Sequence, residues 1–176
     1  LQALIQIGVP AVRVGRPATV STDLQHRTVV ALTEHHPEVI KARSLCKDIA
    51  IPDAKRLTTF DVQRVVQDVQ ESITRTAPVL VTSCIGAQQL QNVNCPLVVL
   101  DAAAQSTEPA FLCSLVSAQA EQVVLVGDTC QLPPTVSCME LKETLGESPM
   151  ARFEQLGVEK HTLRIQYRMA PALLEY

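Results

Sequence analysis

Short, uninterrupted apolar runs recur along this chain. Leu97–Leu100 and Val123–Val126 contain no polar residue, which is typical of strands buried on both faces of a parallel sheet. The same kind of pattern predicts strands at Ala11–Val14 and Val79–Thr82, with His161–Ile165 as the last strand. A loop is expected at 83–87, directly after the second of these strands.

Helical signals fill the segments between the predicted strands. The clearest is an apolar stripe from Phe60 to Ile73, which recurs at helical spacing and predicts a helix that ends near Arg75. Further helices are predicted at 1–8, 21–35, 38–46, 107–117, 140–145, 150–156 and 171–176, and a turn at 51–53. Because strands and helices alternate, the sequence predicts an α/β fold with a parallel, doubly wound sheet.

Polar residues follow the two apolar runs. Asp101 ends the first, and Gly127-Asp128-Thr129-Cys130-Gln131-Leu132-Pro133-Pro134 follows the second. Open α/β sheets bind their ligands at the carboxyl ends of parallel strands. A carboxylate there can hold a hydrated Mg²⁺, directly or through water, or it can simply cap the following helix. The second stretch can equally be a rigid turn between a strand and a helix.

A third polar group occurs near residue 167. Gln166-Tyr167-Arg168-Met169 offers a planar cation suited to phosphate and an aromatic ring suited to stacking. Taken singly, Tyr167 could be a buried ring and Arg168 a surface ion-pair residue. Three such groups in this order are hard to explain by core packing alone.

These three stretches together resemble a known family. DAAAQ, VLVGDTCQLPP and LRIQYRMAPAL are similar to motifs II, III and IV of superfamily 1 helicases, most of all the regulator-of-nonsense-transcripts and immunoglobulin-mu-binding group. VRVGRP and VLVTSCIGA also resemble that group, and the likeness extends over residues 12–176, weakest at 31–77. It implies part of a RecA-like P-loop NTPase core. Residues 1–160 would be the later part of a first RecA-like domain, with a helical excursion at about 21–75, and 161–176 the start of a second. The phosphate-binding loop GxxGxGKT is expected upstream of residue 1.

The resemblance assigns a nucleotide site, with ATP and Mg²⁺ as cofactors. It implies that Asp101 coordinates Mg²⁺ and that Gln131 faces the γ-phosphate. Gly127 would let the backbone approach the site and Asp128 would fix the loop. Gln105 would contact the nucleotide or a neighbouring motif, unless it simply faces solvent as a helix residue.

The resemblance also assigns roles to four residues outside these two stretches. Arg168 would contact the γ-phosphate from the second domain, and Tyr167 would stack on adenine. Thr82 and Ser83 would contact the sugar–phosphate backbone of single-stranded RNA or DNA, since short hydroxyls suit phosphate oxygens. The alternative for these two residues is a polar cap at the end of a strand.

Ala102 departs from the family pattern. The family has glutamate there, and that glutamate polarises the attacking water, whereas alanine offers no proton acceptor. Loss of a general base typically lowers a rate by about 10²–10⁴-fold. A natural inactive copy, an engineered trap or a sequence error would each place alanine at this position. Nucleotide binding does not need the missing carboxylate.

Composition narrows the possibilities less than the motifs do. The 176 residues are 47% hydrophobic, which argues for a packed globule. The net charge of −3 gives no basic footprint for nucleic acid, which argues against a free-standing binding module but little against a helicase fragment. Six cysteines without a CxxC pair predict reduced thiols. No signal peptide or bilayer-spanning run is evident, which predicts a soluble, cytoplasmic or nuclear protein without a membrane partner.

Two hypotheses of different class therefore stand beside each other. The first is a fragment of an ATP-dependent superfamily 1 helicase that couples ATP hydrolysis to movement on single-stranded nucleic acid. The second is a degenerate helicase-like scaffold that binds nucleotide or nucleic acid without hydrolysis. A nucleotide-binding module of another P-loop class is a third possibility, and QYRM argues against it.

Overall fold

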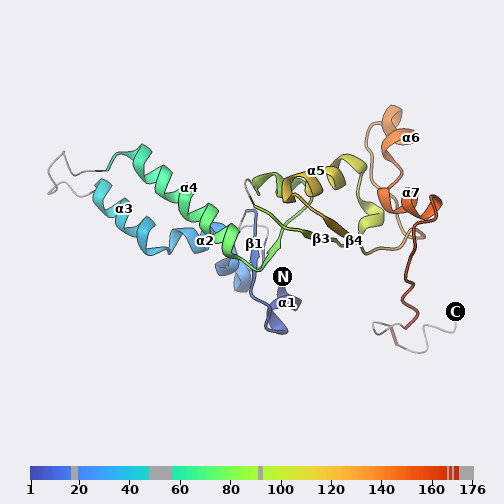
Figure 1. The fold of residues 1–176 in the computed structure, drawn as a ribbon, viewed down its shortest axis with the longest axis horizontal. Helices are drawn as coiled ribbons and strands as arrows, with labels where there is room; N and C mark the ends of the chain where they lie inside the picture. The colour runs from blue at the N-terminus through green and yellow to red at the C-terminus, as the bar shows by residue number, and fades with distance from the viewer. Residues whose placement is uncertain (17–19, 48–56, 91–92, 166, 168, 171–176) are drawn as a thin grey trace.

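Two small parallel sheets form the framework of the chain (Figure 1). The computed structural model describes residues 1–16, 20–47, 57–90, 93–165, 167 and 169–170. After helix α1 (Gln2–Gln6), strand β1 (Ala11–Arg13) pairs with β2 (Val79–Val81). Strand β3 (Leu97–Leu100) pairs with β4 (Gln122–Leu125). Both pairings are parallel, so the predicted α/β class with parallel strands is confirmed, in the form of two two-stranded sheets.

The second sheet is a βαβ unit. Helix α5 (Glu108–Ala118) carries the chain from the end of β3 back to the start of β4. It begins after Thr107, has a proline in its first turn and ends at Gln119, which adopts the left-handed conformation. Leu97 lies opposite Gln122 and Leu100 opposite Leu125, so the two strands end level with each other. The polar residues that follow them therefore emerge at one edge of the sheet.

A helical arm is inserted between β1 and β2. It consists of the 3₁₀ helix η2 (Thr22–Arg27) and helices α2 (Val29–Glu34), α3 (Pro37–Lys47) and α4 (Thr59–Thr76). Figure 1 shows α3 and α4 side by side, reaching away from the sheets. The apolar stripe of α4 is confirmed as helical, and its start is fixed by a capping box. In that box Thr58 Oγ1 accepts from the Asp61 amide, and Asp61 Oδ2 accepts from the Thr58 amide.

The prediction of one helix over 21–35 is wrong, because Thr28 interrupts it. Thr28 has an extended backbone, is buried, and forms a parallel bridge with Arg13 next to the β1–β2 sheet. Its Oγ1 accepts from the Ala31 amide at 3.2 Å and so caps α2. The tertiary contact with the sheet overrides the local helical pattern. A single helix over these residues would pull Thr28 off the sheet.

Two separate apolar clusters stabilise the chain. The first lies beneath β1 and β2 and is built from Val14, Val29, Ala87, Leu90 and Val93. The second lies against β3 and β4 and consists of Leu100, Ala103 and Phe111, with Leu115, Leu125, Met150 and Phe153 packed on it. This second cluster joins α5, the end of β3 and the later helix α7, and it supports the candidate site described below.

Neither β3 nor β4 is buried on both faces, so that prediction is wrong for both apolar runs. Leu97 is 53% exposed and Val99 60% exposed, while Leu100 is buried in the second cluster. Val124, opposite Val99, is exposed on the same face. Side chains alternate between the two faces of a strand. Within the described residues, α5 and the second cluster cover only one face of this sheet.

The chain after β4 folds back onto the second sheet. The 3₁₀ helix η6 (Met139–Leu141) leads into α6 (Lys142–Leu145), and α7 (Pro149–Gln155) follows. Helix α7 is fastened to α5 by two contacts: Arg152 Nη2 donates to Glu108 Oε1 at 2.6 Å, and the Phe153 ring meets Phe111 edge-on, with centroids 6.1 Å apart. The predicted loop at 83–87 is largely a 3₁₀ helix, η4 (Ile85–Gln89).

Residues 161–165 do not form the predicted strand. They have no strand pairing in the described part of the chain, and Leu163 is 91% exposed. Apolar alternation gives a stable strand only where a neighbouring strand takes its hydrogen bonds. The predicted turn at 51–53 and the predicted helix at 171–176 lie outside the described residues.

Candidate functional site

The stretches after β3 and β4 are joined by backbone hydrogen bonds. The Val126 amide donates to the Leu100 carbonyl at 2.9 Å, which continues the strand pairing by one step. The Ala103 amide then donates to the Val126 carbonyl, also at 2.9 Å. DAAAQ and GDTCQLPP therefore form one edge of one sheet, as the pattern of apolar runs predicted.

Gly127 lets the two stretches approach this closely. A Cβ atom at this position would lie 3.1 Å from the backbone nitrogens of both Ala103 and Ala104, and 2.9 Å from Met150 Sδ. Ala103 and Ala104 are themselves buried. Any other residue here would press its Cβ against backbone atoms that cannot rotate away, so the neighbouring turn would have to shift.

Asp101 and Ala102 form an exposed turn between β3 and the 3₁₀ helix η5 (Ala103–Gln105). Ala102 adopts the left-handed conformation, with φ 53° and ψ 39°, and its amide donates to Asp101 Oδ1 at 2.9 Å. The Asp101 carboxylate therefore stands at the edge of the sheet and remains accessible. Gln105, one short turn further on, is also exposed.

Asp128 organises the loop after β4. Its Oδ1 accepts from the Cys130 amide at 2.9 Å, and its Oδ2 accepts from Gln131 Nε2 at 3.1 Å. The hydrogen bond from the Cys130 amide, followed by that from Gln131, lowers the pKa of the Asp128 carboxyl. This carboxylate holds the Gln131 side chain against its own loop, while the second N–H and the Oε1 of the same amide can still bind another partner.

One contact of this loop was not predicted from the sequence. Thr129 Oγ1 donates to Oε2 of Glu154, on α7, at 2.7 Å, and Lys160 Nζ donates to the other oxygen of the same carboxylate. Thr129 and Glu154 are separated by 25 residues, and no motif or periodicity links them. Only the docking of α7 on α5 brings them together.

Thr82 and Ser83 follow β2, with Gly86 packed against their hydroxyls. A Cβ on Gly86 would lie 2.6 Å from Thr82 Oγ1 and 2.8 Å from Ser83 Oγ, which accepts from the Gly86 amide at 3.1 Å. Thr82 Oγ1 is buried and has no hydrogen-bond partner within the described residues. Tyr167 is 90% exposed in the C-terminal segment, and Arg168 lies outside the described residues. Thr82 and Ser83 thus follow a strand of the first sheet, and the adjacent Cys84 packs on the second apolar cluster.

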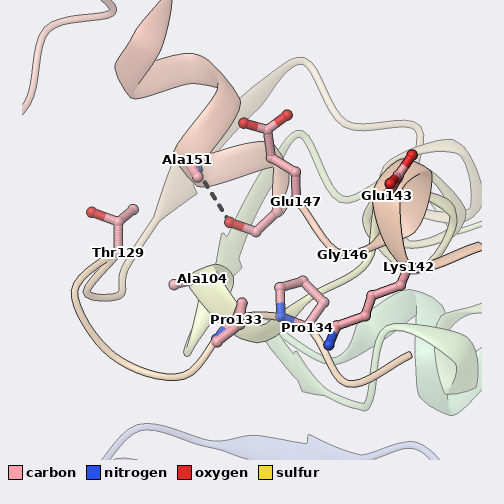
Figure 2. A pocket seen from close by; sticks show the side chains of 10 residues that line it. Ala104, Thr129, Pro133, Pro134, Lys142, Glu143, Gly146, Glu147 and Ala151 are labelled. Atoms are coloured by element: carbon pink, nitrogen blue, oxygen red, sulfur yellow. Dashed lines mark hydrogen bonds between the residues drawn. The ribbon is translucent and has the colours of Figure 1, made fainter. Parts of the chain in front are cut away.

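A cavity of about 390 Å³ lies behind the loop that follows β4 (Figure 2). It is lined on one side by Ala104, Thr129, Pro133 and Pro134, and on the other by Lys142, Glu143, Gly146, Glu147, Ser148 and Ala151. In Figure 2 the Lys142 side chain extends toward Pro134, while the Glu147 carboxylate points away from the proline side. None of the residues predicted to bind nucleotide lines this cavity, although Ala104 and Thr129 are direct neighbours of Gln105 and Asp128.

The donor set for a metal is sparse. Among the described residues no group of three or more His, Cys, Asp and Glu side chains gathers at metal-binding spacing. Mg²⁺ commonly keeps several waters and takes one or two carboxylates together with phosphate oxygens, so one exposed aspartate fits a magnesium–nucleotide complex better than a metal bound by protein alone. All six cysteines lie in the described residues, and none of them forms a disulfide.

Residues 47–139, just over half of the chain, match the family model described as the AAA domain, and the chain belongs to this family. Among curated proteins it is 40% identical over 110 residues to the regulator of nonsense transcripts 1 homolog of Arabidopsis thaliana. The aligned region covers 61% of this chain and 9% of that protein. It is 34% identical over 164 residues to regulator of nonsense transcripts 1 of Caenorhabditis elegans, covering 89% of this chain and 15% of that protein.

A third relative is the ATP-dependent helicase upf1 of Schizosaccharomyces pombe, 34% identical over 143 residues, covering 78% of this chain and 15% of that protein. The chain spans between 9% and 15% of the length of these three relatives. The resemblance to the regulator-of-nonsense-transcripts group is thereby confirmed. No helix in the described parts of the chain is long and apolar enough to cross a membrane.

Proposed function

We propose that this chain is part of an ATP-dependent superfamily 1 helicase that couples ATP binding and hydrolysis to movement on single-stranded RNA or DNA. Residues 1–160 would belong to the first RecA-like domain and 161–176 would open the second. The observation that carries the proposal is the joined edge, where the Ala103 amide bonds the Val126 carbonyl and Gly127 admits the close approach. This arrangement holds an aspartate and a glutamine loop together at the ligand-binding edge of a parallel sheet.

In this proposal the exposed Asp101 carboxylate binds the Mg²⁺ of ATP. Gln131 leaves its hydrogen bond to Asp128 and turns to the γ-phosphate, and Gln105 contacts the nucleotide beside it. Tyr167 stacks on adenine, and Arg168 contacts the γ-phosphate when the second domain closes. An arginine of this kind contributes about 10³–10⁵-fold to the rate in other nucleotide hydrolases.

The nucleic acid would lie along the residues after β2. The buried Thr82 Oγ1 lacks a partner among the described residues, and Ser83 is exposed beside it. Gly86 lies against both hydroxyls, and any side chain at this position would crowd them. Phosphate oxygens accept from such hydroxyls and from backbone amides, and these contacts carry no base preference.

A specific observation favours a second function. Ala102 stands where the family has the glutamate that polarises water, and its exposed methyl group offers no proton acceptor. A protein that binds ATP and nucleic acid but hydrolyses slowly would act as a nucleotide-dependent scaffold. The two functions predict different rates of ATP hydrolysis but the same binding of ATP and nucleic acid.

The test compares the full-length protein with its Ala102→Glu variant at saturating ATP, with and without single-stranded RNA. Residue 102 is exposed, so glutamate fits without crowding the core. We expect the variant to hydrolyse ATP faster, by up to about 10²–10⁴-fold, and RNA to stimulate it. Asp101→Asn on top of Ala102→Glu is the matched control and should remove the gain.

Two outcomes oppose the helicase proposal in different ways. Equal rates for both forms, together with RNA binding that depends on ATP, would support the scaffold instead. Equal rates without any nucleotide binding would refute both. Single-stranded DNA in place of RNA, measured in the same assay, decides which nucleic acid stimulates the enzyme.

A further inference from the structure

Glu154 bonds both to Thr129, which precedes it in the sequence, and to Lys160, which follows it. Its Oε2 accepts from Thr129 Oγ1, in the loop after β4, at 2.7 Å. Its Oε1 accepts from Lys160 Nζ, six residues further along the chain, and the two form an ion pair. Each carboxylate oxygen therefore serves a different partner.

The helix that carries Glu154 is firmly held. The neighbouring residues Arg152 and Phe153 contact Glu108 and Phe111 on α5, and Ser148 Oγ accepts from the Ala151 amide to cap the helix start. Thr129 and Ala151 line the same cavity, which places the loop beside α7 (Figure 2). Glu154 thus reaches the loop from a base that is fixed to the second sheet.

The two partners differ in how firmly they are held. Thr129 lies in a tight turn, because the backbone amide of Gln131 donates to the backbone carbonyl of Asp128 at 3.1 Å. Lys160 stands at the start of an exposed segment, 161–165, that has no strand pairing among the described residues. In sequence this segment leads directly to QYRM.

We propose that Glu154 is a positioning residue that couples the segment after α7 to the loop that carries Gln131. When Lys160 holds Oε1, the carboxylate is fixed in the orientation that presents Oε2 to Thr129. When the segment moves and Lys160 departs, the carboxylate is free to rotate and the loop loses its anchor on α7. This inference rests on the proposed function only for its consequence, that movement of a second domain changes the position of Gln131.

The first test needs neither nucleotide nor turnover. Amide hydrogen exchange of residues 128–131 is measured in the full-length protein and in Thr129→Val, Glu154→Ala and Lys160→Met. A hydrogen bond to a charged group is a strong one, so Thr129→Val and Glu154→Ala should speed exchange in this loop by about tenfold. Thr129→Ser, which restores the hydroxyl, should return it to the parent rate.

Lys160→Met decides the coupling. It leaves both Thr129 and Glu154 in place, so faster loop exchange in this variant shows that the lysine acts on the loop through the carboxylate. The matched control is Gln155→Ala, which removes the hydrogen bond from Gln155 Nε2, at the end of α7, to Glu147 Oε1, just before the helix starts, and should leave the loop unchanged. Loop exchange at the parent rate in Lys160→Met, or equal acceleration in the control, would overturn the proposal.

A second readout separates this inference from the proposed function. In the Ala102→Glu background, Lys160→Met should lower RNA stimulation of kcat severalfold while KM for ATP stays within about twofold, because the variant alters the loop rather than ground-state binding. A loss that falls on KM alone would contradict a positioning role. If Ala102→Glu itself shows no turnover, the proposed function fails, and the exchange comparison still decides whether Glu154 couples the two segments.

Discussion

Replacing Gly127 with alanine tests the joined edge directly. The added Cβ would lie 3.1 Å from the backbone nitrogens of Ala103 and Ala104 and 2.9 Å from Met150 Sδ. The methionine sulfur can move, since its side chain is flexible. The two backbone nitrogens belong to a buried 3₁₀ turn and can move only if the whole turn moves. The substitution therefore pushes η5 away from the end of β4.

The cost follows from two effects. Overpacking of a well-packed site typically costs about 1–3 kcal/mol, and weakening the hydrogen bond from the Ala103 amide to the Val126 carbonyl costs about 1 kcal/mol more. A total of about 2–4 kcal/mol corresponds to a fall in Tm of roughly 4–16 °C for a domain of this size.

Thermal unfolding followed by circular dichroism measures the loss, and amide exchange locates it at Ala103. Gly157→Ala is the control, because Gly157 has φ +77° with nothing within 4 Å of the added Cβ, so its cost is backbone strain without contact. It should lower Tm while the Ala103 amide stays protected. If Gly127→Ala shifts Tm by less than about 1 °C and leaves Ala103 protected, the close approach does not constrain the edge.

Three further predictions follow from the same geometry. Ala102→Gly should raise Tm by about 2–4 °C in a melting experiment, because a left-handed alanine costs about 1 kcal/mol or more and glycine does not. The pKa of Glu154 is lowered by its hydrogen bonds from Lys160 and then Thr129, so its contribution to stability is present above the unfolded pKa and is lost as pH falls through the lower folded pKa. Urea midpoints should therefore decline less on the acid side in Glu154→Gln than in the parent protein. Arg168→Ala on the Ala102→Glu background should lower kcat more than it raises the nucleotide Kd. Arg168→Lys should restore little activity, because only the guanidinium fork matches charge spread over the γ-phosphoryl oxygens. Unchanged kcat with normal RNA stimulation would make Arg168 a structural residue.

The sequence pattern predicted the second sheet well because its information is local. Two apolar runs separated by a helix that starts with Thr107 and Pro109 define a βαβ unit, and such units are parallel. The edge formed by DAAAQ and GDTCQLPP follows from that topology alone. Asp128 was expected to fix its loop, and its bonds to Cys130 and Gln131 show how it does so.

What the pattern could not predict depends on contacts between distant segments. An apolar run indicates that a strand could be covered on both faces, but not that anything in the chain covers Leu97 and Val99. The helical pattern over 21–35 carries no sign that Thr28 joins the first sheet. The contact between Thr129 and Glu154 requires α7 to be docked, which no spacing in the sequence encodes.

The hydrogen bond between Ala103 and Val126 has a consequence for engineering. The two stretches are joined by a backbone hydrogen bond and pack closely at Gly127, so they should be exchanged together as one unit. A chimera that takes residues 96–105 from a relative but keeps the native residues 123–131 would combine two stretches from different proteins whose close packing is not matched. Grafts between this chain and its relatives should therefore move both stretches together, with Met150 included, since its sulfur fills the remaining side of the same gap.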